Sequence, residues 1–264
     1  MKFTKDLLGT VLLSFASALP GAGLGGDQAH GEGEESRAGR EVQKTTEEKA
    51  GPFDPAAVPV YHPPLRGAPP PTRLVGGGTR SSGKAQPRLA VLAPEHTGLT
   101  ATNQPVLYWY VSAPVGDRLE LTIIDETAIQ PLLEAALDPP VRVGVQRVAL
   151  ADYDLSLRPG VTYQWSIALV PDPDKRSRDV ITSGTIKYLD PPRSLADKLV
   201  HASPMARPYL YAEAGYWYDA LTALSTLIDQ APAGGSLRQK RAALLEQVGL
   251  LEVAAYDRQL AESR

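Results

Sequence analysis

The chain has 264 residues and a net charge of −3, with 43% hydrophobic and 22% charged residues. These values are ordinary for a globular protein, and the charge excludes a basic field that would attract nucleic acid or anionic membranes. Cysteine is absent, which excludes disulfides, cysteine-ligated zinc, iron–sulfur clusters and thiol nucleophiles. We therefore expect one or two folded domains and, since the sequence holds no cofactor motif, no cofactor.

The N-terminus has the features of a secretory signal peptide. Lys2 and Lys5 give a charged start, Leu7 to Phe15 is apolar, and positions 16–18 (Ala-Ser-Ala) are small enough for a signal peptidase. The apolar run is shorter than the roughly 20 residues that a transmembrane helix needs. We expect residues 1–18 to direct export to the periplasm or the cell exterior, with no transmembrane span; an uncleaved anchor or a buried helix is the alternative.

Residues 19–65 are rich in Pro, Gly and Glu and contain few large apolar side chains. Such a segment buries too little apolar surface to offset the entropy lost on ordering. We therefore expect residues 19–65 to be disordered.

A glycine-rich stretch follows, with three consecutive glycines at positions 76–78 between Arg73 and Arg80. It matches neither common phosphate-binding motif, although successive glycine amides between two arginines can hold an anion. A backbone strap that needs glycine for close approach is the simpler account. Arg73 and Arg80 are the candidate anion contacts.

From Arg88 onward the pattern favours strands. Short runs rich in Val, Ile, Tyr and Trp alternate with turn residues, and no convincing long helix lies between them. The expected strands are 89–92, 106–111, 119–124, 132–136, 146–150, 162–169 and 180–188. Seven antiparallel strands over about a hundred residues are typical of a β-sandwich, which we place at residues 66–190.

The stretch LRPGVTYQW refines this expectation. Leu157, Pro159, Gly160 and Tyr163 resemble the Leu-x-Pro-Gly-x-x-Tyr pattern of fibronectin type III domains, which are immunoglobulin-like sandwiches. The resemblance implies a tyrosine corner, in which the ring enters the core and the hydroxyl bonds to nearby backbone.

The stretch PVLYW, at residues 105–109, resembles the strand that carries a core tryptophan in such domains. On a strand, Tyr108 and Tyr110 point to one face and Trp109 to the other. One face must be core, so either the tryptophan or the tyrosine pair could be exposed.

After residue 192 the apolar period lengthens towards 3.6, so residues 191–264 should form a helical tail. One continuous helix could run through Gly215, but a second interpretation uses that glycine as a turn. Gly215, Trp217, Ala220 and Pro232 resemble the second half of a tetratricopeptide repeat in order and spacing.

Gly249 and Ala254 follow Gly215 and Ala220 at the period of that repeat, which is about 34 residues. Ser236 and Gln239 have the spacing of a capping box for the second helix pair. Such arrays need about three repeats to bury their faces, so we expect the helices to dock on the sandwich or on a partner.

This interpretation divides the aromatic side chains of the first helix pair into two groups. Trp217 becomes a packing residue, and Tyr211 its neighbour. Tyr209, Tyr216 and Tyr218 remain free to face something else, so they are the candidate partner contacts.

A whole-chain resemblance follows from six blocks. They are RGAPPPTRLVGGGTR, LAPEHTGLT, PVLYWYV, TIIDE, PDPDKRSRDV and YAEAGYWYDAL, in that order. Together they resemble the bacterial domain-of-unknown-function family 928, whose members are typically exported, over residues 66–251. The resemblance implies no activity, and it implies that the glycine-rich stretch belongs to the folded unit.

The sequence shows no catalytic or metal-binding constellation. The four histidines lack the HxH or HxxxH spacing of metal ligands, GxSxG is absent, and we expect His96 to be a polar turn residue. Residues 171–179 carry three acids and three cations without the ligand order of an EF-hand, so local salt bridges are the better account.

Three functions remain open. We expect a non-catalytic interaction protein of the bacterial cell envelope, whose partner is another envelope protein. The alternative is a carbohydrate-binding sandwich that stacks sugars on Tyr108, Tyr110 or Tyr216. An enzyme comes third, and a deep polar pocket with a perturbed carboxylate would favour it.

Overall fold

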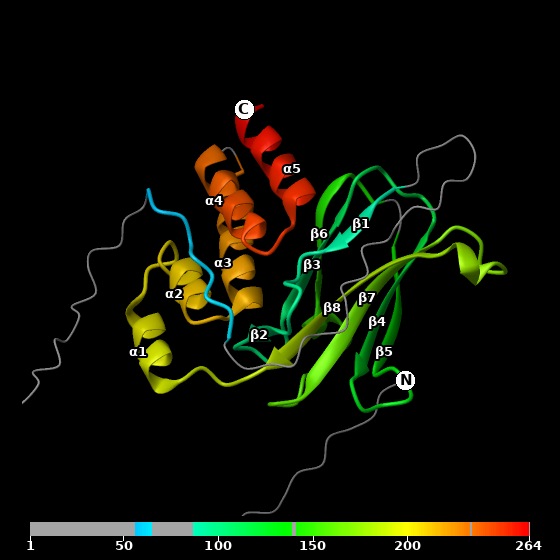
Figure 1. The fold of residues 1–264 in the computed structure, drawn as a ribbon, viewed down its shortest axis with the longest axis horizontal. Coiled ribbons are helices and arrows are strands. Elements are labelled where there is room, and N and C mark those ends of the chain that lie inside the picture. The colour runs from blue at the N-terminus through cyan, green and yellow to red at the C-terminus, as the bar shows by residue number, and fades with distance from the viewer. Residues whose placement is uncertain (1–55, 65–86, 139–140, 233, 264) are drawn as a thin grey trace, which may run out of the picture. The chain divides into compact units, whose positions relative to one another are not determined.

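The computed structural model describes residues 56–64, 87–138, 141–232 and 234–263, all within the compact unit 51–264. The expected signal peptide (residues 1–18), Arg73 and Arg80 lie outside these residues. The described residues form eight strands and five α-helices, so the fold class is α+β, as the sequence predicts (Figure 1).

All seven expected strands are present, each to within two residues at either end. They are β1 (Leu89–Val91), β3 (Val106–Val111), β4 (Arg118–Asp125), β5 (Leu133–Leu137), β6 (Gly144–Ala149), β7 (Thr162–Val170) and β8 (Val180–Tyr188). The expectation of a seven-stranded antiparallel sandwich is nevertheless wrong. An eighth strand, β2 (Gly98–Thr100), pairs parallel with β8. Its three residues, GLT, include only one large apolar side chain, so the sequence does not mark them as a strand.

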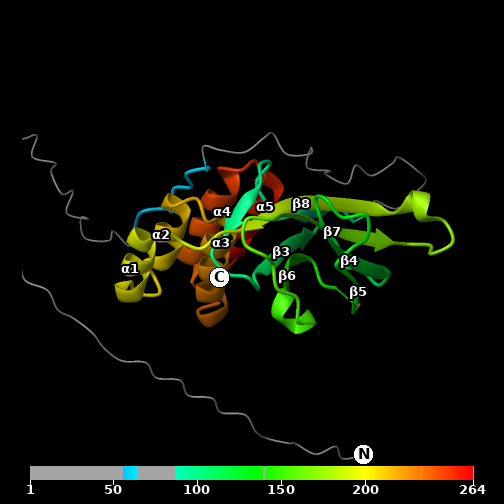
Figure 2. The same cartoon turned by 90° about the horizontal axis from the view of Figure 1, so that it is seen from below.

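The strands form two sheets. One has three strands in the order β1-β3-β6, and the other has five in the order β2-β8-β7-β4-β5. The long hairpin of β7 and β8 extends away from the helices (Figure 2). At its tip, Arg176 pairs with Asp179 and with Glu120 of β4, and Lys175 pairs with Asp172. These are the salt bridges expected for residues 171–179.

The two sheets share an apolar core. Leu119, Leu121 and Ile123 alternate along β4 with half-buried residues, which is the period of a strand with one face in the core. Tyr163 on β7 is 1% exposed, and its hydroxyl accepts a hydrogen bond from the backbone N–H of Arg158 at 3.0 Å. The hydroxyl-to-backbone bond that the LRPGVTYQW motif predicts is therefore present.

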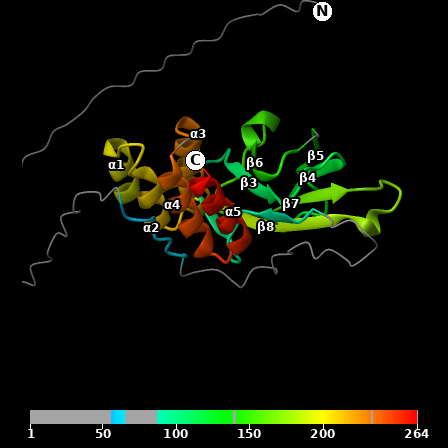
Figure 3. The same cartoon turned by 90° about the horizontal axis from the view of Figure 1, so that it is seen from above.

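Five helices gather at one end of the sheets (Figure 3). They are α1 (Arg193–His201), α2 (Arg207–Glu213), α3 (Trp217–Gln230), α4 (Gly235–Glu246) and α5 (Leu251–Glu262). Gly215 (φ 82°) and Gly249 (φ 74°) turn the chain between α2 and α3 and between α4 and α5. Left-handed backbone is strained for other residue types, so glycine allows both turns, and one continuous helix through Gly215 is excluded.

The expected capping box of Ser236 and Gln239 does not form. Helix α4 already begins at Gly235, with Gly234 as its N-cap, and no side chain caps its amides. Ser236 therefore lies inside the first turn and not ahead of it, so its hydroxyl is past the position from which it would cap.

The helices dock on the sandwich, which is one of the two outcomes expected. The indole Nε1 of Trp217 donates to the carbonyl oxygen of Leu92 at 2.8 Å. The hydroxyl of Tyr218 donates to the carbonyl oxygen of Thr185 at 2.9 Å and accepts from Nε1 of Trp165 at 2.9 Å. Both aromatic side chains of α3 are thereby fixed to the sheets.

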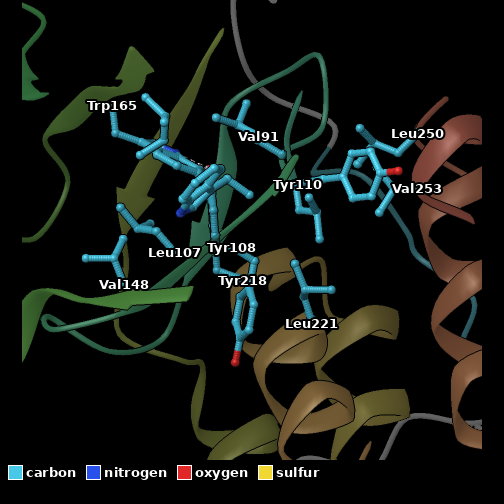
Figure 4. Packing of buried hydrophobic residues seen from close by; sticks show 14 of the residues in the cluster. Val91, Leu107, Tyr108, Tyr110, Val148, Trp165, Tyr218, Leu221, Leu250 and Val253 are labelled. Atoms are coloured by element: carbon cyan, nitrogen blue, oxygen red, sulfur yellow. Dashed lines mark hydrogen bonds between the residues drawn. The ribbon is translucent and has the colours of Figure 1, made fainter. Parts of the chain in front are cut away.

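This docking buries the second face of β3 as well. Trp109 is 2% exposed, and Tyr108 and Tyr110 on the opposite face are only 4% and 5% exposed. Tyr110 points towards Leu250 and Val253 at the start of α5 (Figure 4). Neither the tryptophan nor the tyrosine pair, either of which could have been exposed, is therefore exposed, because helices cover the second face. Within the described residues, no helix is long and apolar enough to cross a membrane.

Candidate functional site

An extended segment, residues 56–64 (AAVPVYHPP), lies beside α2 and α4 (Figure 1). We call it the proline segment. It falls inside the region 19–65 expected to be disordered, and for the residues of this segment that expectation is wrong. The reason is that helix side chains take up its backbone groups, and that Tyr61 is buried to 6% exposure. The low apolar content of a segment predicts disorder, but it does not reveal that one aromatic side chain can dock and order its neighbours.

Gln247, at the C-cap of α4, recognises the backbone of the proline segment. Its side-chain Nε2 donates to the carbonyl oxygen of Pro59 at 2.8 Å, and its Oε1 accepts from the N–H of Tyr61 at 2.8 Å. Gln247 thus bonds to the carbonyl of one residue and to the N–H of the residue two positions later. A neighbouring β-strand would make the same two bonds, so the amide side chain takes the place of a strand. Because both partners are backbone groups, Gln247 reads the extended conformation and not the side chains.

The two ends of the proline segment are also held through backbone. The hydroxyl of Tyr209 and Nζ of Lys240 both donate to the carbonyl oxygen of Ala57, at 2.8 and 2.5 Å. At the other end, the N–H of His62 donates to the carbonyl oxygen of Ala212 at 3.1 Å. We call the surface formed by Ala212, Tyr209, Lys240 and Gln247 the helical groove.

The ring of Tyr61 fills an aromatic pocket between the helices and the sandwich. It meets Trp217 edge-on at a centroid distance of 5.1 Å and stacks on His96 at 5.7 Å. Its hydroxyl lies 2.7 Å from Nε2 of His96. Burial lowers the pKa of His96 and raises that of Tyr61, which favours the neutral form of both groups. His96 is therefore a contact of the proline segment and not only the polar turn residue that we expected.

Gly215 is required here for a second reason. A Cβ atom at this position would lie 2.9 Å from the carbonyl oxygen of His62 and 3.6 Å from Cδ of Pro64. The turn between α2 and α3 thus lies directly against the proline segment, and any side chain there would press on it.

The three tyrosines expected to contact a partner have separate positions. Tyr209 is half-buried and lines the helical groove. Tyr216 and Tyr218 are 4% and 1% exposed, and the hydroxyl of Tyr216 donates to the carbonyl oxygen of Asp190 at 3.1 Å. These two side chains are not free surfaces, because the helix that carries them packs against the sandwich. The structure brings neither into the groove.

A cavity of about 480 Å³ lies between the β2–β3 loop and helices α2 and α3. Asp219, in the first turn of α3, lines it, and its Oδ2 accepts from the N–H of Ala101 at 2.8 Å. Burial raises the pKa of this carboxyl group from 3.8 to about 7. Asp219 is the sole acid on the cavity wall, which is otherwise formed by Thr100, Thr102, Gln104, Pro105, Val106, Pro204, Arg207, Tyr211, Tyr218, Thr222, Ala223, Thr226, Leu227 and Gln230.

This cavity meets the criterion that would favour an enzyme in part only. It contains one perturbed carboxyl group, but acid–base and nucleophilic mechanisms generally need a second titratable or nucleophilic partner. The wall holds no second carboxylate, histidine or lysine, so only tyrosine and threonine hydroxyls could serve as that partner. Within the described ranges, no cluster of three or more His, Asp or Glu could hold a metal ion.

Sequence reasoning misses Tyr61, Gln247, Lys240 and Asp219. Tyr61 carries a usable signal, since it is a large aromatic inside a segment that otherwise has few. Gln247 and Lys240 carry none, because a polar residue within or at the end of a helix is ordinary and its partner lies far away in the chain. Long-range pairing of this kind becomes visible only once the helices are placed.

The comparisons with known proteins give a family and no relative. No curated protein and no solved structure matches the chain. The family model described as Domain of Unknown Function (DUF928) matches residues 75–257, most of the chain and nearly all of the sandwich and helices. It leaves out the proline segment, and it agrees with the resemblance drawn from the six sequence blocks. The chain therefore belongs to the DUF928 family of domains of unknown function.

Proposed function

We propose that this protein is a non-catalytic interaction protein of the bacterial cell envelope that binds extended protein segments in its helical groove. The observation that carries the proposal is the pair of hydrogen bonds from the Gln247 side chain to the backbone at Pro59 and Tyr61. The groove holds an extended segment of this chain, and its contacts use groups that every peptide possesses. Location in the envelope rests on residues 1–18 of the sequence.

The contacts divide into two kinds with different roles. Gln247, Lys240, Tyr209 and Ala212 bond to backbone, which supplies affinity for any extended segment. The pocket around Tyr61 accepts an aromatic ring, which supplies selectivity. Peptide recognition by strand addition works in the same way, with main-chain bonds for affinity and pockets for specificity.

The two fold resemblances support this proposal by analogy. Without β2, the strands divide into three and four, as in an immunoglobulin-like sandwich, and Tyr163 makes the bond of a tyrosine corner. The two left-handed glycines, one repeat period apart, favour a tetratricopeptide-like tail. Both kinds of scaffold commonly serve in recognition, which is an argument from fold and not from site chemistry.

The carbohydrate-binding alternative loses the surface on which it depended. Tyr108, Tyr110 and Tyr216 are each at most 5% exposed, so none offers a ring face to a sugar. A small-molecule site or an enzyme remains a second candidate, because the Asp219 cavity combines volume with a perturbed carboxyl group. We favour the interaction protein because the groove already holds an extended segment of this chain through its backbone.

The proposal is tested with a labelled peptide that copies residues 53–65. In the Tyr61→Ala protein the internal segment loses its anchor, so the peptide should bind in place of it and fluorescence anisotropy should rise. The Tyr61→Ala, Gln247→Ala double variant should bind at least tenfold more weakly. Gln259→Ala in place of Gln247→Ala is the matched control, because that side chain is exposed on α5. A folded Tyr61→Ala protein that binds no peptide would show that the groove holds a permanent structural contact.

The same variants identify a natural partner. Envelope extract passed over immobilised Tyr61→Ala protein should yield a protein that the double variant does not retain. If both variants retained the same proteins, those proteins would bind somewhere other than the helical groove.

A further inference from the structure

A second cavity, of about 400 Å³, lies on the other side of α3, between the three-stranded sheet and helices α3, α4 and α5. Its wall carries three arginines: Arg147 on β6, and Arg238 and Arg241 on α4. Only Asp229 supplies a carboxylate to the wall itself. The wall is thus rich in guanidinium groups in a protein whose net charge is negative.

The charge of Arg241 is already neutralised. Its Nε and NH2 donate to the two oxygens of Asp257 at 2.6 and 2.7 Å, and its NH1 donates to Oγ of Ser225 at 3.1 Å. Asp257 is fully buried, and both of its oxygens are occupied by this two-bond contact. Arg241 and Asp257 together form a neutral pair, so Arg241 offers the cavity no uncompensated charge.

Arg238 has no such partner. Its side chain is 13% exposed, and its closest approach to Asp257 is 3.7 Å, to an oxygen that Arg241 already holds. The Nε of Arg238 is buried and has no hydrogen-bond partner in the described part of the chain. A buried donor without an acceptor is costly, and a guanidinium group cannot relieve the cost by losing its proton.

Arg147 completes the arrangement from the sheet side. It lies directly opposite Tyr108 in the register of β3 and β6, so its side chain leaves the sheet on the face that the helices cover. It is exposed, and no ion pair to it forms within the described residues. Two guanidinium groups from different elements therefore border one cavity with a single exposed carboxylate, Asp229, on its wall.

We propose that this cavity binds a small oxyanion, a carboxylate or a phosphate group, between Arg238 and Arg147. The planar guanidinium fork matches such oxygens with two parallel hydrogen bonds, and both arginines line the cavity. The anion would also link the sheet to α4, so it would stabilise the docked helices. This site is separate from the helical groove and does not depend on it.

The test titrates sodium phosphate and sodium acetate into the whole protein at constant ionic strength set with sodium chloride. Binding to the native state should raise the melting temperature with concentration, as linkage requires. Arg238→Gln and Arg147→Gln should each weaken the apparent affinity at least tenfold. Arg193→Gln is the matched control, since it removes an exposed arginine on α1 and should leave the titration unchanged.

Each outcome decides the matter. A shift with phosphate alone assigns a phosphate group, and a shift with acetate alone assigns a carboxylate. Equal shifts in the wild type and in both cavity variants, or no shift beyond that of chloride, would overturn the proposal. Arg147→Gln keeps the test decisive if Arg238→Gln unfolds the protein, because Arg147 is exposed.

Discussion

The two helix pairs use the same turn in different surroundings. Gly215 joins α2 to α3 and Gly249 joins α4 to α5 one repeat period later, and both glycines have left-handed backbone. Ala220 and Ala254, at the same distance after each glycine, are fully buried. The two pairs therefore share the same glycine turn and the same buried alanine in the second helix.

The pairs differ where helix meets sandwich. Trp217 is fully buried and bonds to Leu92, whereas Leu251, at the matching position of the second pair, is 65% exposed. Tyr218 bonds to the sheet from a buried site, whereas Glu252 at the matching position forms an exposed ion pair with Arg88. The repeat period thus locates turns and helix contacts, but docking decides which further faces are buried.

The largest expected effect comes from replacing the two matched apolar residues. Trp217→Ala removes a fully buried indole, its edge-on contact with Tyr61 and its bond to Leu92, so it should lower the free energy of unfolding by about 3–5 kcal/mol. Leu251→Ala should change it by less than about 1 kcal/mol, because that side chain is mostly exposed. Urea denaturation measures both. Similar losses in the two variants would mean that the pairs are equally docked.

The next effect concerns Asp219, which the second pair lacks, since Val253 holds the matching position. Its pKa is about 7 in the fold against 3.8 unfolded, so the native state binds the extra proton between these values. Stability from this group is therefore complete below the unfolded pKa and is lost as the pH rises through the folded pKa, by an amount on the order of a few kcal/mol.

Asp219→Asn should flatten this pH dependence, because an amide can still accept from Ala101 without a charge. Urea midpoints at pH 4.5, 6 and 8 test this directly. A slope that persists in the variant would assign the pH dependence to other groups, of which His96 acts in the opposite direction. Burial lowers its pKa, so its stability contribution is present above its unfolded pKa and is lost as the pH falls through the folded value.

The sequence predicts the fold well where a pattern has room to repeat. Strands β3 and β8 match their expected ranges residue for residue, and the glycine spacing locates both turns. Strand β2 escapes prediction because its three residues, GLT, hold one large apolar side chain, whereas the equally short β1 is the apolar run LAV. The burial of Tyr108 and Tyr110 escapes it because one strand cannot reveal what covers its second face.

The site can be predicted far less. The sequence pattern of the helices names Tyr209 as a candidate partner contact, and Tyr209 does line the helical groove. Tyr216 and Tyr218, named on the same grounds, are buried in the core. Gln247 and Lys240 bond to residues of the proline segment that lie far away in the chain. Such contacts depend on the docking of the helices, which no local pattern encodes.

A smaller effect should separate the two glycines. Gly215→Ala and Gly249→Ala both force alanine into left-handed backbone, which costs roughly 1–2 kcal/mol. Only Gly215→Ala also places a methyl group 2.9 Å from the carbonyl oxygen of His62, while the space around Gly249 is open. Gly215→Ala should therefore lose more stability and also expose the proline segment to protease. If both variants lost the same stability and were cleaved equally, the proline segment would be able to move away from the new methyl group without loss of stability.

The smallest effect tests how the second pair is held to the sandwich. Glu252→Gln breaks the exposed contact with Arg88, so it should cost less than about 1 kcal/mol, and the difference from wild type should fade in concentrated salt. Asp257→Asn, by contrast, leaves the buried Arg241 without its counter-charge and should be far more damaging at any salt concentration. If Glu252→Gln proved as costly as Asp257→Asn, attachment through the surface would hold the pair in place. The expected order instead means that the second pair depends more on its buried internal ion pair than on its exposed ion pair with the sandwich.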